Sequence, residues 1–501
     1  MLFLVLVGSG LPTGTAQAAT YRGLLSGSGD YRFTSVVGVP GAVVAVGEWT
    51  DPGHKDGNTY IAGQSHPLIV KLSTDGAILW SKPLTTAGGC GWFNSVAVLG
   101  DGNVIAAGTA CPADTSQGRD FLIAKFDLSG RELWRKTQGH SSDDDLNTVI
   151  RSASGGFVAA GSYWLSGAYN SYIAGFDSNG QELWSDAFRG GQFNSVATLP
   201  NGNYLAGGIA YSTSTEFPTS ATAGLTVEYS PAGHREGGHL YSGLGSLGIV
   251  SLVAATDGGV LIAGSQNLAK LSSTTGATLW KTTVTWSGGY SSLGLPTRKW
   301  ATHTIKLSGL VATSDGGALA VGRVESDSVE ELPVENGIAV RFRTDGKKQW
   351  IRNVGGDFGT FTGFAAAIPS GQGFILAGQT DMYSHGYKRA ATVTPVTATG
   401  GVSWIATGLL PALSARKAPK ITGTIKVGKK LKASKGSWSA QPASVKYQWL
   451  RNGRKIAGAT SSTYRLKKAD RGKRVSVVVA VHRAGFRDAH KRSSRTAKVS
   501  K

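Results

Sequence analysis

The chain has 501 residues, of which 71 are glycine, 13 are tryptophan and two are methionine. Glycine is about twice as frequent as usual, while charged residues make up 16 % of the chain against a usual share of about 25 %. The hydrophobic content of 41 % argues against a disordered chain, and the glycines lack the three-residue period of collagen. Because helix-forming residues are scarce over most of the length, we expect a fold built from strands.

A short apolar run opens the chain, from Leu2 to Val7, and an Ala-x-Ala pattern follows at residues 16–18. This order predicts a signal peptide over residues 1–19, and hence a secreted, cell-surface or cell-wall protein. The basic residues that usually precede such a run are missing, so an unstructured N-terminus is the alternative. No other stretch approaches the roughly 18 apolar residues of a membrane span, so we expect no transmembrane segment.

One sequence unit recurs seven times over residues 20–412. It begins with an alternating apolar run, such as Phe93–Val96, and continues through a tight glycine turn into a strand of small residues. These small-residue strands end in Gly47, Gly108, Gly161, Gly208, Gly264, Gly322 and Gly378. After a variable loop come a further strand, a second turn and a glycine with tryptophan four residues later. These pairs are Gly76/Trp80, Gly130/Trp134, Gly180/Trp184, Gly276/Trp280, Gly346/Trp350 and Gly400/Trp404. The fourth unit has Gly237 where tryptophan is expected.

Each unit of about 54 residues has room for four strands of five or six residues and two tight turns. Seven such units predict an all-β fold, a seven-bladed β-propeller. We expect each tryptophan on the outermost strand, packed between neighbouring blades. The repeats resemble the glycine-rich, delta-sixty type propeller repeats of secreted bacterial proteins, which are similar to the propellers of PQQ-type quinoproteins. The resemblance covers about residues 20–410. It implies the fold but no particular function, because proteins with many different activities share this fold.

Long, variable segments are expected on one face of this propeller, which marks it as the binding face. They are Trp49–Pro67, Cys111–Arg119, Tyr163–Asn170, Tyr211–Ala223, Arg323–Asn336 and Gln379–Lys388, with the crossovers Lys136–Leu146 and Val284–Ile305. The candidate ligand-binding residues are the aromatic and histidine side chains Trp49, His66, Trp92, Trp164, Tyr169, Trp286, Trp300 and His385. Such side chains suit a sugar or a protein ligand. The alternative is that they form small cores within their own loops.

The two cysteines, Cys90 and Cys111, flank adjacent strands on this same face. In an exported protein they predict a disulfide bond. A metal site is the alternative, but it would need further ligands nearby.

No motif of a hydrolase, metalloprotease or nucleotide-binding loop occurs, so we predict no catalytic residue, metal or cofactor. Asp143–Asp145, beside His140, are expected to form a solvated acidic loop, with a cation or ligand contact as the alternative. A second acidic loop runs from Glu325 to Glu335. Two acidic loops could supply a general acid and a base, so a propeller-fold glycosidase or lyase is the alternative function.

The C-terminal segment carries the charge. Residues 416–501 hold 25 Lys and Arg but two Asp and Glu, whereas the whole chain has a net charge of +20. Residues 1–415 are therefore close to neutral. We expect a linker over residues 413–419 and a small β-sandwich over residues 420–501, with Trp449 at its centre and a hairpin turn at Asn452–Gly453. This stretch resembles the Ig-like modules of actinobacterial surface proteins, without their cysteines.

A dense positive charge suits a polyanion. The candidate contacts are Lys429, Lys430, Lys432, Lys467, Lys468, Arg471 and Arg474. We expect an anionic cell-wall polymer or glycan as the partner; a solvated spacer and nucleic-acid binding are the alternatives, and no nucleic-acid motif favours the latter. The sequence as a whole predicts an exported, monomeric, non-enzymatic binding protein, whose propeller face recognises a glycan or another surface protein.

Overall fold

The structure is a computed structural model that describes residues 21–23, 30–51, 53–56, 59–61, 63–73, 78–114, 118–139, 142–290, 299–324, 336–354, 360–370, 373–382, 388–397, 405–407, 415–438, 444–482 and 489–501. The expected signal peptide lies outside these residues. The chain divides into two compact units, the first mainly Gly27–Gly408 and the second mainly Leu409–Lys501. The described residues form strands and turns, with one short 3-10 turn, η3 (Lys468–Asp470). The predicted all-β class is confirmed.

Antiparallel sheets follow one another along the first unit. The first contains β2 (Asp30–Val39), β3 (Ala42–Thr50), β6 (Ser65–Ser73) and β7 (Ile78–Pro83), with the small hairpin β4 (His54–Asp56) and β5 (Thr59–Ile61) between β3 and β6. The second contains β8 (Gly91–Val98), β9 (Val104–Ala110), β10 (Asp120–Phe126) and β11 (Glu132–Gln138). The third contains β12 (Asp144–Arg151), β13 (Phe157–Leu165), β14 (Ala168–Phe176) and β15 (Glu182–Arg189). The fourth contains β16 (Gly191–Thr198), β17 (Tyr204–Ala210), β18 (Ala223–Tyr229) and β19 (Arg235–Tyr241).

The later sheets repeat this order. The fifth contains β20 (Ser251–Ala254), β21 (Val260–Ala263), β22 (Asn267–Leu271) and β23 (Thr278–Thr283). The next has five strands: β24 (Thr285–Tyr290), β25 (Lys299–Ala312), β26 (Ala318–Val324), β27 (Asn336–Phe342) and β28 (Lys348–Val354). The last runs in the order β1-β32-β31-β30-β29, with β1 (Tyr21–Gly23), β29 (Thr360–Ser370), β30 (Gly373–Met382), β31 (Lys388–Thr397) and β32 (Ile405–Thr407).

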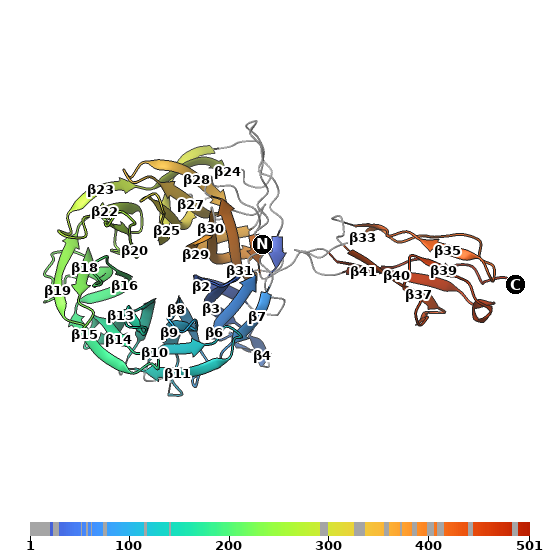
Figure 1. The fold of residues 1–501 in the computed structure, drawn as a ribbon, viewed down its shortest axis with the longest axis horizontal. Helices are drawn as coiled ribbons and strands as arrows, with labels where there is room; N and C mark the ends of the chain where they lie inside the picture. Colours follow the sequence, from blue (N-terminus) through green and yellow to red (C-terminus); the bar gives the residue numbers. More distant parts are fainter. Residues whose placement is uncertain are drawn as a thin grey trace. The chain divides into compact units, whose positions relative to one another are not determined.

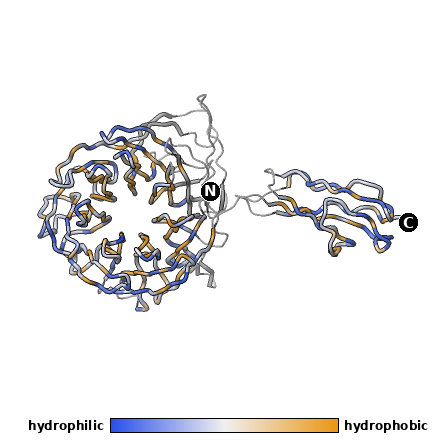
Figure 2. Tube along the Cα trace, viewed as in Figure 1, coloured by the Kyte–Doolittle hydropathy of each residue, from blue (hydrophilic) through white to orange (hydrophobic). Residues whose placement is uncertain are grey.

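The sheets of the first unit stand around a central axis, as in a β-propeller (Figure 1). Strands β8, β16 and β20 lie near the axis, and β11, β19 and β23 lie at the rim. The inner and middle strands are the most hydrophobic, whereas the rim strands are more hydrophilic (Figure 2). This gradient follows from burial, because sheets packed face to face cover both sides of every inner strand.

The second strand of each sheet shows why small apolar residues recur there. All seven residues of β9 are buried. Val104 and Ala106 belong to the core shared with the preceding sheet, whereas Ile105 and Ala107 belong to the core shared with the following one. Alternate side chains therefore fill two different interfaces, as the two-residue period of a strand requires.

A β-bulge in the inner strands β2, β8, β12, β16, β25 and β29 places a side chain against the next sheet or along its edge. In β8 the register shifts between Phe93 and Ser95, so that Asn94 is the extra residue. The Asn94 side-chain amide donates to the Leu146 carbonyl of the next sheet, at 2.9 Å. Corresponding bonds run from Thr34 to Phe93, Asn147 to Phe193, Asn194 to Ile249 and Ser308 to Phe364. We call these side chains the bulge residues.

The rim tryptophans also cross from one sheet to the next. Trp80 lies over Gly130 of the following sheet, and its indole N–H donates to the Leu128 carbonyl at 3.1 Å. Trp134 lies over Gly180 and Trp184 over Gly233 in the same way. These contacts confirm the predicted position of the tryptophans between neighbouring units.

Three sequence expectations about segments of the binding face were wrong. Tyr163–Asn170 is not a long loop: β13 and β14 continue to a two-residue turn, Ser166–Gly167, with φ of 52° and 78°. Positive φ at both positions is the type I′ hairpin geometry. The segment Val284–Ile305 is also not an irregular crossover, because β24 pairs with the first half of β25 within it. The third expectation concerned Asp143–Asp145, of which Asp144 and Asp145 begin strand β12.

The second unit has its own core. Its strands are β33 (Ala415–Lys417), β34 (Ile421–Thr422), β35 (Lys430–Ala433), β36 (Ser437–Trp438), β37 (Ser444–Arg451), β38 (Arg454–Lys455), β39 (Thr463–Arg465), β40 (Val475–His482) and β41 (Ala489–Arg492). Alternate residues of β40, from Val475 to Val481, face Trp449, which is fully buried. The buried carboxylate of Asp470 accepts bonds from Arg451 Nε (2.6 Å), the Tyr464 hydroxyl (2.9 Å) and the Lys467 N–H (2.7 Å). The predicted Asn452–Gly453 turn is present, with φ of 46° and 90°.

Candidate ligand face and basic surface

We call one edge of the sheets the loop edge. It carries the loops between the second and third strands of each sheet and the crossovers from one sheet to the next. Its segments include 51–64, 111–119 and 211–222, of which residues 52, 57–58, 62 and 115–117 lie outside the described part of the chain. The opposite edge has turns of about five residues, such as 99–103 and 199–203. The loop edge thus has the longer and more variable segments, as expected from the sequence. It is the edge at which the described candidate ligand residues of the first unit lie.

A stack of three rings occupies the loop edge of the first sheet. Trp49 at the end of β3 is paired with Tyr31 on β2 and with His66 on β6. The ring centroids of Tyr31 and Trp49 are 6.3 Å apart, and those of Trp49 and His66 are 5.1 Å apart, both nearly parallel. Two candidate residues, Trp49 and His66, are therefore brought into direct contact by strand register.

The surroundings of this stack are polar. His66 Nε2 lies 3.7 Å from Asp51 Oδ2. The backbone N–H of Gly53 donates to Asp51 and, with smaller contributions from Gln64 and His66, holds the pKa of that carboxyl below its usual value. Burial raises the pKa of the Tyr31 hydroxyl. Within the described part of the chain, the buried Trp49 Nε1 and His66 Nδ1 have no hydrogen-bond partner.

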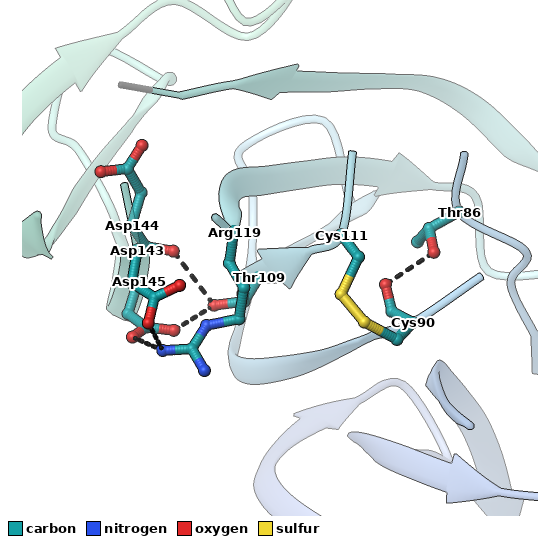
Figure 3. The surroundings of a disulfide bond; sticks show 8 residues. All are labelled: Thr86, Cys90, Thr109, Cys111, Arg119, Asp143, Asp144 and Asp145. Atoms are coloured by element: carbon teal, nitrogen blue, oxygen red, sulfur yellow. Dashed lines mark hydrogen bonds and ion pairs between the residues drawn. A yellow bond between two sulfur atoms is a disulfide. The ribbon is translucent and has the colours of Figure 1, made fainter. Parts of the chain in front are cut away.

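A charged group joins the second and third sheets. The guanidinium of Arg119 lies over the Trp92 ring, 5.4 Å from its centroid, and forms ion pairs with Asp143 (3.1 Å) and Asp145 (3.2 Å). Figure 3 shows Arg119 between these two carboxylates, while the Asp144 side chain points away from it. The acidic loop expected from the sequence is thus an ion-paired cluster, because a basic side chain from the neighbouring sheet reaches it.

A side-chain hydrogen bond also holds this cluster together. The Thr109 hydroxyl donates to Asp145 at 2.5 Å, across the interface between the second and third sheets. Asp144 is fully buried at the start of β12. The candidate residue Trp92 is therefore covered by a guanidinium that is itself paired with two carboxylates.

An exposed aromatic patch occupies the loop edge of the third and fourth sheets. Trp164 and Tyr169 face each other across the β13–β14 hairpin, with an edge-to-face ring separation of 4.8 Å. Tyr169 in turn stacks on Tyr211, at 5.7 Å, and the Tyr211 hydroxyl donates to Gln192 at 3.0 Å. Trp164 and Tyr169 are 37 % and 41 % exposed. We call Trp164, Tyr169 and Tyr211 the aromatic patch.

Trp286 and Trp300 lie on β24 and β25, where Gly289 is paired with Trp300 and Trp286 with His303. They are strand residues and not loop residues, which corrects the sequence expectation. His385 lies outside the described residues.

The predicted disulfide is confirmed: Cys90 and Cys111 are bonded, with their Cα atoms 5.1 Å apart. The backbone supports the bridge, because the Cys111 N–H donates to the Cys90 carbonyl at 2.8 Å. The Thr86 hydroxyl donates to the same carbonyl at 2.6 Å (Figure 3). The bridge fixes the crossover before β8 to the loop that follows β9.

Several residues of the loop edge escaped the sequence analysis. Arg119, Tyr31 and Gln192 hold candidate side chains in place. Tyr31 could have been found, because it starts an alternating strand opposite Trp49. Arg119 had no local signal, because its two partners lie on the next sheet, more than 20 residues away.

All seven basic candidates on the second unit are exposed. Lys430 and Lys432 project from the same side of β35, whose alternate residues Leu431 and Ala433 are buried. Lys430 is paired with Arg465 on β39, so that Arg465, which the sequence analysis omitted, joins this side. Lys467 and Lys468 follow directly. Arg474 differs, because its guanidinium donates to the Thr496 carbonyl at 3.0 Å.

Within the described ranges, no group of three or more His, Cys, Asp or Glu side chains could hold a metal ion. In the same part of the chain, no helix has the length and apolar character needed to cross a membrane.

Comparisons with known proteins give one sequence relative and several similar structures. No family model matches the chain. It is 24 % identical over 455 residues to the regulatory protein FlaEY of Caulobacter vibrioides, covering 80 % of this chain and 45 % of that protein. The chain thus spans about half the length of the curated relative that it matches.

Among solved structures, the Dos1 propeller is 10 % identical with a TM-score of 0.37, covering 69 % of this chain and 74 % of that one. Hsv2 of Kluyvelomyces marxianus is also 10 % identical, with a TM-score of 0.36 and coverages of 76 % and 98 %. Sqt1 of Chaetomium thermophilum is 10 % identical, with a TM-score of 0.34 and coverages of 80 % and 96 %.

Proposed function

We propose that this chain is an exported or cell-surface binding protein with a seven-bladed β-propeller and a basic Ig-like module. The successive four- and five-stranded sheets of the first unit support the blade number. The buried Trp449 and the alternating valines of β40 support a sandwich core in the second unit. The disulfide and the apolar N-terminal run support export, because structural disulfides persist in oxidising compartments.

The aromatic patch is the observation that carries the proposed binding role. Trp164 and Tyr169 project from a two-residue hairpin, so little conformational entropy is lost when they contact a ligand. Aromatic rings offer apolar faces, while Gln192 and the tyrosine hydroxyls offer hydrogen bonds beside them. This combination suits a ligand with both apolar and hydroxyl-bearing surfaces, so we propose a glycan, with a protein surface as the alternative ligand.

The proposed binding role predicts the effect of removing the patch. We expect Trp164→Ala combined with Tyr169→Ala to weaken binding to glycans selected on an array by at least about tenfold, because each aromatic contact contributes about 1 kcal/mol or more. Leu183→Ala is the matched control, since Leu183 is 60 % exposed on the rim strand β15. Unchanged binding by the double variant, or equal loss in the control, would contradict the proposal.

We further propose that the basic surface of the second unit holds the protein on an anionic cell-wall polymer or glycan. The last 86 residues contain 25 basic residues and two acidic ones. One of the two acidic residues, Asp470, is already paired with Arg451 within the unit. The surface around Lys430, Lys432 and Arg465 therefore has no nearby described carboxylate partner to offset it. Attraction of this kind weakens as salt screens the charges.

Sedimentation of the full-length protein with purified cell walls across a salt series tests this attachment. We expect binding at low salt that decreases steadily as salt is added. Replacing Lys430, Lys432 and Lys467 with Glu should abolish most of it, while exchanging the same three for Arg should preserve it. Absence of binding at low salt, or binding that does not change with salt concentration, would refute the proposed attachment.

A further inference from the structure

An open cavity lies beside the rim strand of the fourth unit, which lacks the rim tryptophan. The cavity is about 200 Å³ and lies between the fourth and fifth sheets. Its walls include Leu205, Glu228, Gly237, Val260 and Leu271. We call it the rim cavity.

Comparison among the repeats shows which group is missing. Trp184 contacts Tyr204 and Tyr229, the first residue of β17 and the last residue of β18, at 6.2 and 6.3 Å between ring centroids. The corresponding positions of the fifth sheet are Val260 and Leu271, the first residue of β21 and the last of β22. Both line the rim cavity. Position 237 supplies no side chain for this surface, and the His239 ring lies over Gly276 in the way that Trp184 lies over Gly233. The surface formed by Val260 and Leu271 is therefore left without an indole.

The interface between the second and third sheets provides a comparison with the indole in place. A cavity of about 170 Å³ lies between the second and third sheets, and its lining includes Lys136 and Gly180. Trp134 and the Phe157 ring on which it stacks at 6.3 Å are not among its lining residues. The rim cavity, in contrast, extends to the corresponding Gly237 and Val260. The two cavities are similar in volume, and the rim cavity differs in that it reaches the position that an indole occupies elsewhere.

The charge next to the missing tryptophan is reversed as well. Trp80, Trp134, Trp280 and Trp350 are each paired across the rim strands with a basic residue: Lys71, Lys125, Lys270 and Arg341. The third unit pairs Trp184 with Gly175. In the fourth unit, Gly237 is paired with Glu228. One position thus lacks both an indole and the usual cation, and presents a carboxylate.

The carboxylate is held in place by neutral groups. Asn203 and Asn201 donate to Glu228 Oε1 at 2.7 and 3.1 Å. In the first unit, by comparison, Lys71 Nζ and the Trp80 indole both donate to the Leu128 carbonyl of the next sheet, at 3.0 and 3.1 Å. A ring with an attached cation therefore matches the chemistry that fills this interface elsewhere.

We propose that the rim cavity binds a small planar aromatic ring that carries a cationic amine. The ring lies over Gly237 against Val260 and Leu271, and the amine lies beside Glu228. A cavity of about 150 Å³ is large enough to take up benzene, so the volume suits a one- or two-ring compound. This site is separate from the loop edge, because it lies on the rim.

Calorimetric titration of the full-length protein with tryptamine, at pH 8 where histidine side chains carry little charge, tests the proposal. Indole-3-propionate is the matched anionic ligand. We expect saturable tryptamine binding and weaker binding of the anion, by up to about tenfold, because one exposed charge contact is worth at most about a factor of ten.

Three variants locate the site. We expect Gly237→Trp to abolish tryptamine binding by filling the cavity, and Glu228→Gln to reduce the preference for tryptamine over the anion. Glu182→Gln, which alters a carboxylate lining the neighbouring cavity, should leave both affinities unchanged. Equal affinity for the two ligands, no saturable tryptamine binding, or full binding by correctly folded Gly237→Trp would overturn the proposal.

Discussion

Replacing Gly208 with alanine tests the packing rule that joins the first two strands of each sheet. Gly208 on β17 lies opposite the β-bulge of β16, where the register shifts between Phe193 and Ser195. A Cβ atom at Gly208 would overlap the Gln192 carbonyl oxygen and lie 2.9 Å from Phe193 Cα. Both are backbone atoms, so no side-chain rotation relieves the overlap.

The cost follows from what must move. Forcing a methyl group into packed backbone costs about 1–3 kcal/mol. Relief requires the bulge to shift, which also breaks the 2.9 Å bond from Asn194 to the Ile249 carbonyl of the next sheet and costs a further ~1 kcal/mol. Alanine also restricts the unfolded chain, which raises the free energy of unfolding by about 0.4–1 kcal/mol. We expect Gly208→Ala to lower the free energy of unfolding by about 2 kcal/mol.

Urea unfolding of the full-length protein, followed by circular dichroism, measures this change through the midpoint of the first unit's transition. Gly237→Ala is the control within the same sheet, because a Cβ there meets nothing within 4 Å. It should leave the midpoint unchanged or raise it slightly. In the Gly208→Ala background, a further Asn194→Ala exchange should have little additional effect, because its bond is already broken.

Two results would refute the reasoning. One is a loss below about 1 kcal/mol for Gly208→Ala, which would mean that the strands separate at little cost. The other is full additivity of the Gly208→Ala and Asn194→Ala effects, which would mean that the bulge does not move.

Three further changes test other parts of the first unit. We expect Asn194→Ala alone to lower the free energy of unfolding by about 1–2 kcal/mol, because it leaves a carbonyl between the sheets without its donor; urea unfolding measures it. Exchange of Cys90 and Cys111 for Ser should cost about 3 kcal/mol through loss of a loop closure over a sequence separation of 21 residues, read from thermal unfolding. Hydrogen bonding, first from the Ser129 hydroxyl, lowers the pKa of Asp127 to about 2. A lowered pKa stabilises the fold at pH values above about 4, the unfolded value, so the stability difference between wild type and Asp127→Asn should shrink as the pH falls from 4 to 2 in pH-dependent unfolding.

Each of these changes has a control. Asn179→Ala, at an exposed turn, is the control for Asn194→Ala and should alter the free energy of unfolding by less than about 0.5 kcal/mol. A loss as large as that of Asn194→Ala would contradict the stabilising role of the bulge residues. A reductant should destabilise the wild type but not the double serine variant, and equal sensitivity would contradict the role of the bridge. For Asp127→Asn, a stability difference that stays constant down to pH 2 would show that its carboxylate contributes no pH-dependent stabilisation.

Local pattern was enough to predict much of the fold. The alternating runs, the glycine turns and the tryptophan spacing are read within about ten residues, and period-two burial follows from strand geometry itself. They predicted the all-β class, the rim position of Trp80 and the pairing of Cys90 with Cys111. Trp49 and His66 were expected only on the same face, and the strand pairing of β3 with β6 places them opposite each other.

The tertiary structure decided whatever depends on the neighbouring sheet. Arg119 forms ion pairs with Asp143 and Asp145 only because the second and third sheets pack together, whereas the sequence alone suggested a solvated loop. The two-residue turn at Ser166–Gly167 turned an expected loop into a rigid hairpin, since the flanking strands gain hydrogen bonds by extending. The sequence showed that Gly237 stands where the other units have tryptophan. Only the packing of the fourth sheet against the fifth placed a cavity beside it. Contacts between residues about 50 positions apart depend on how the repeats stack, and no local periodicity encodes that stacking.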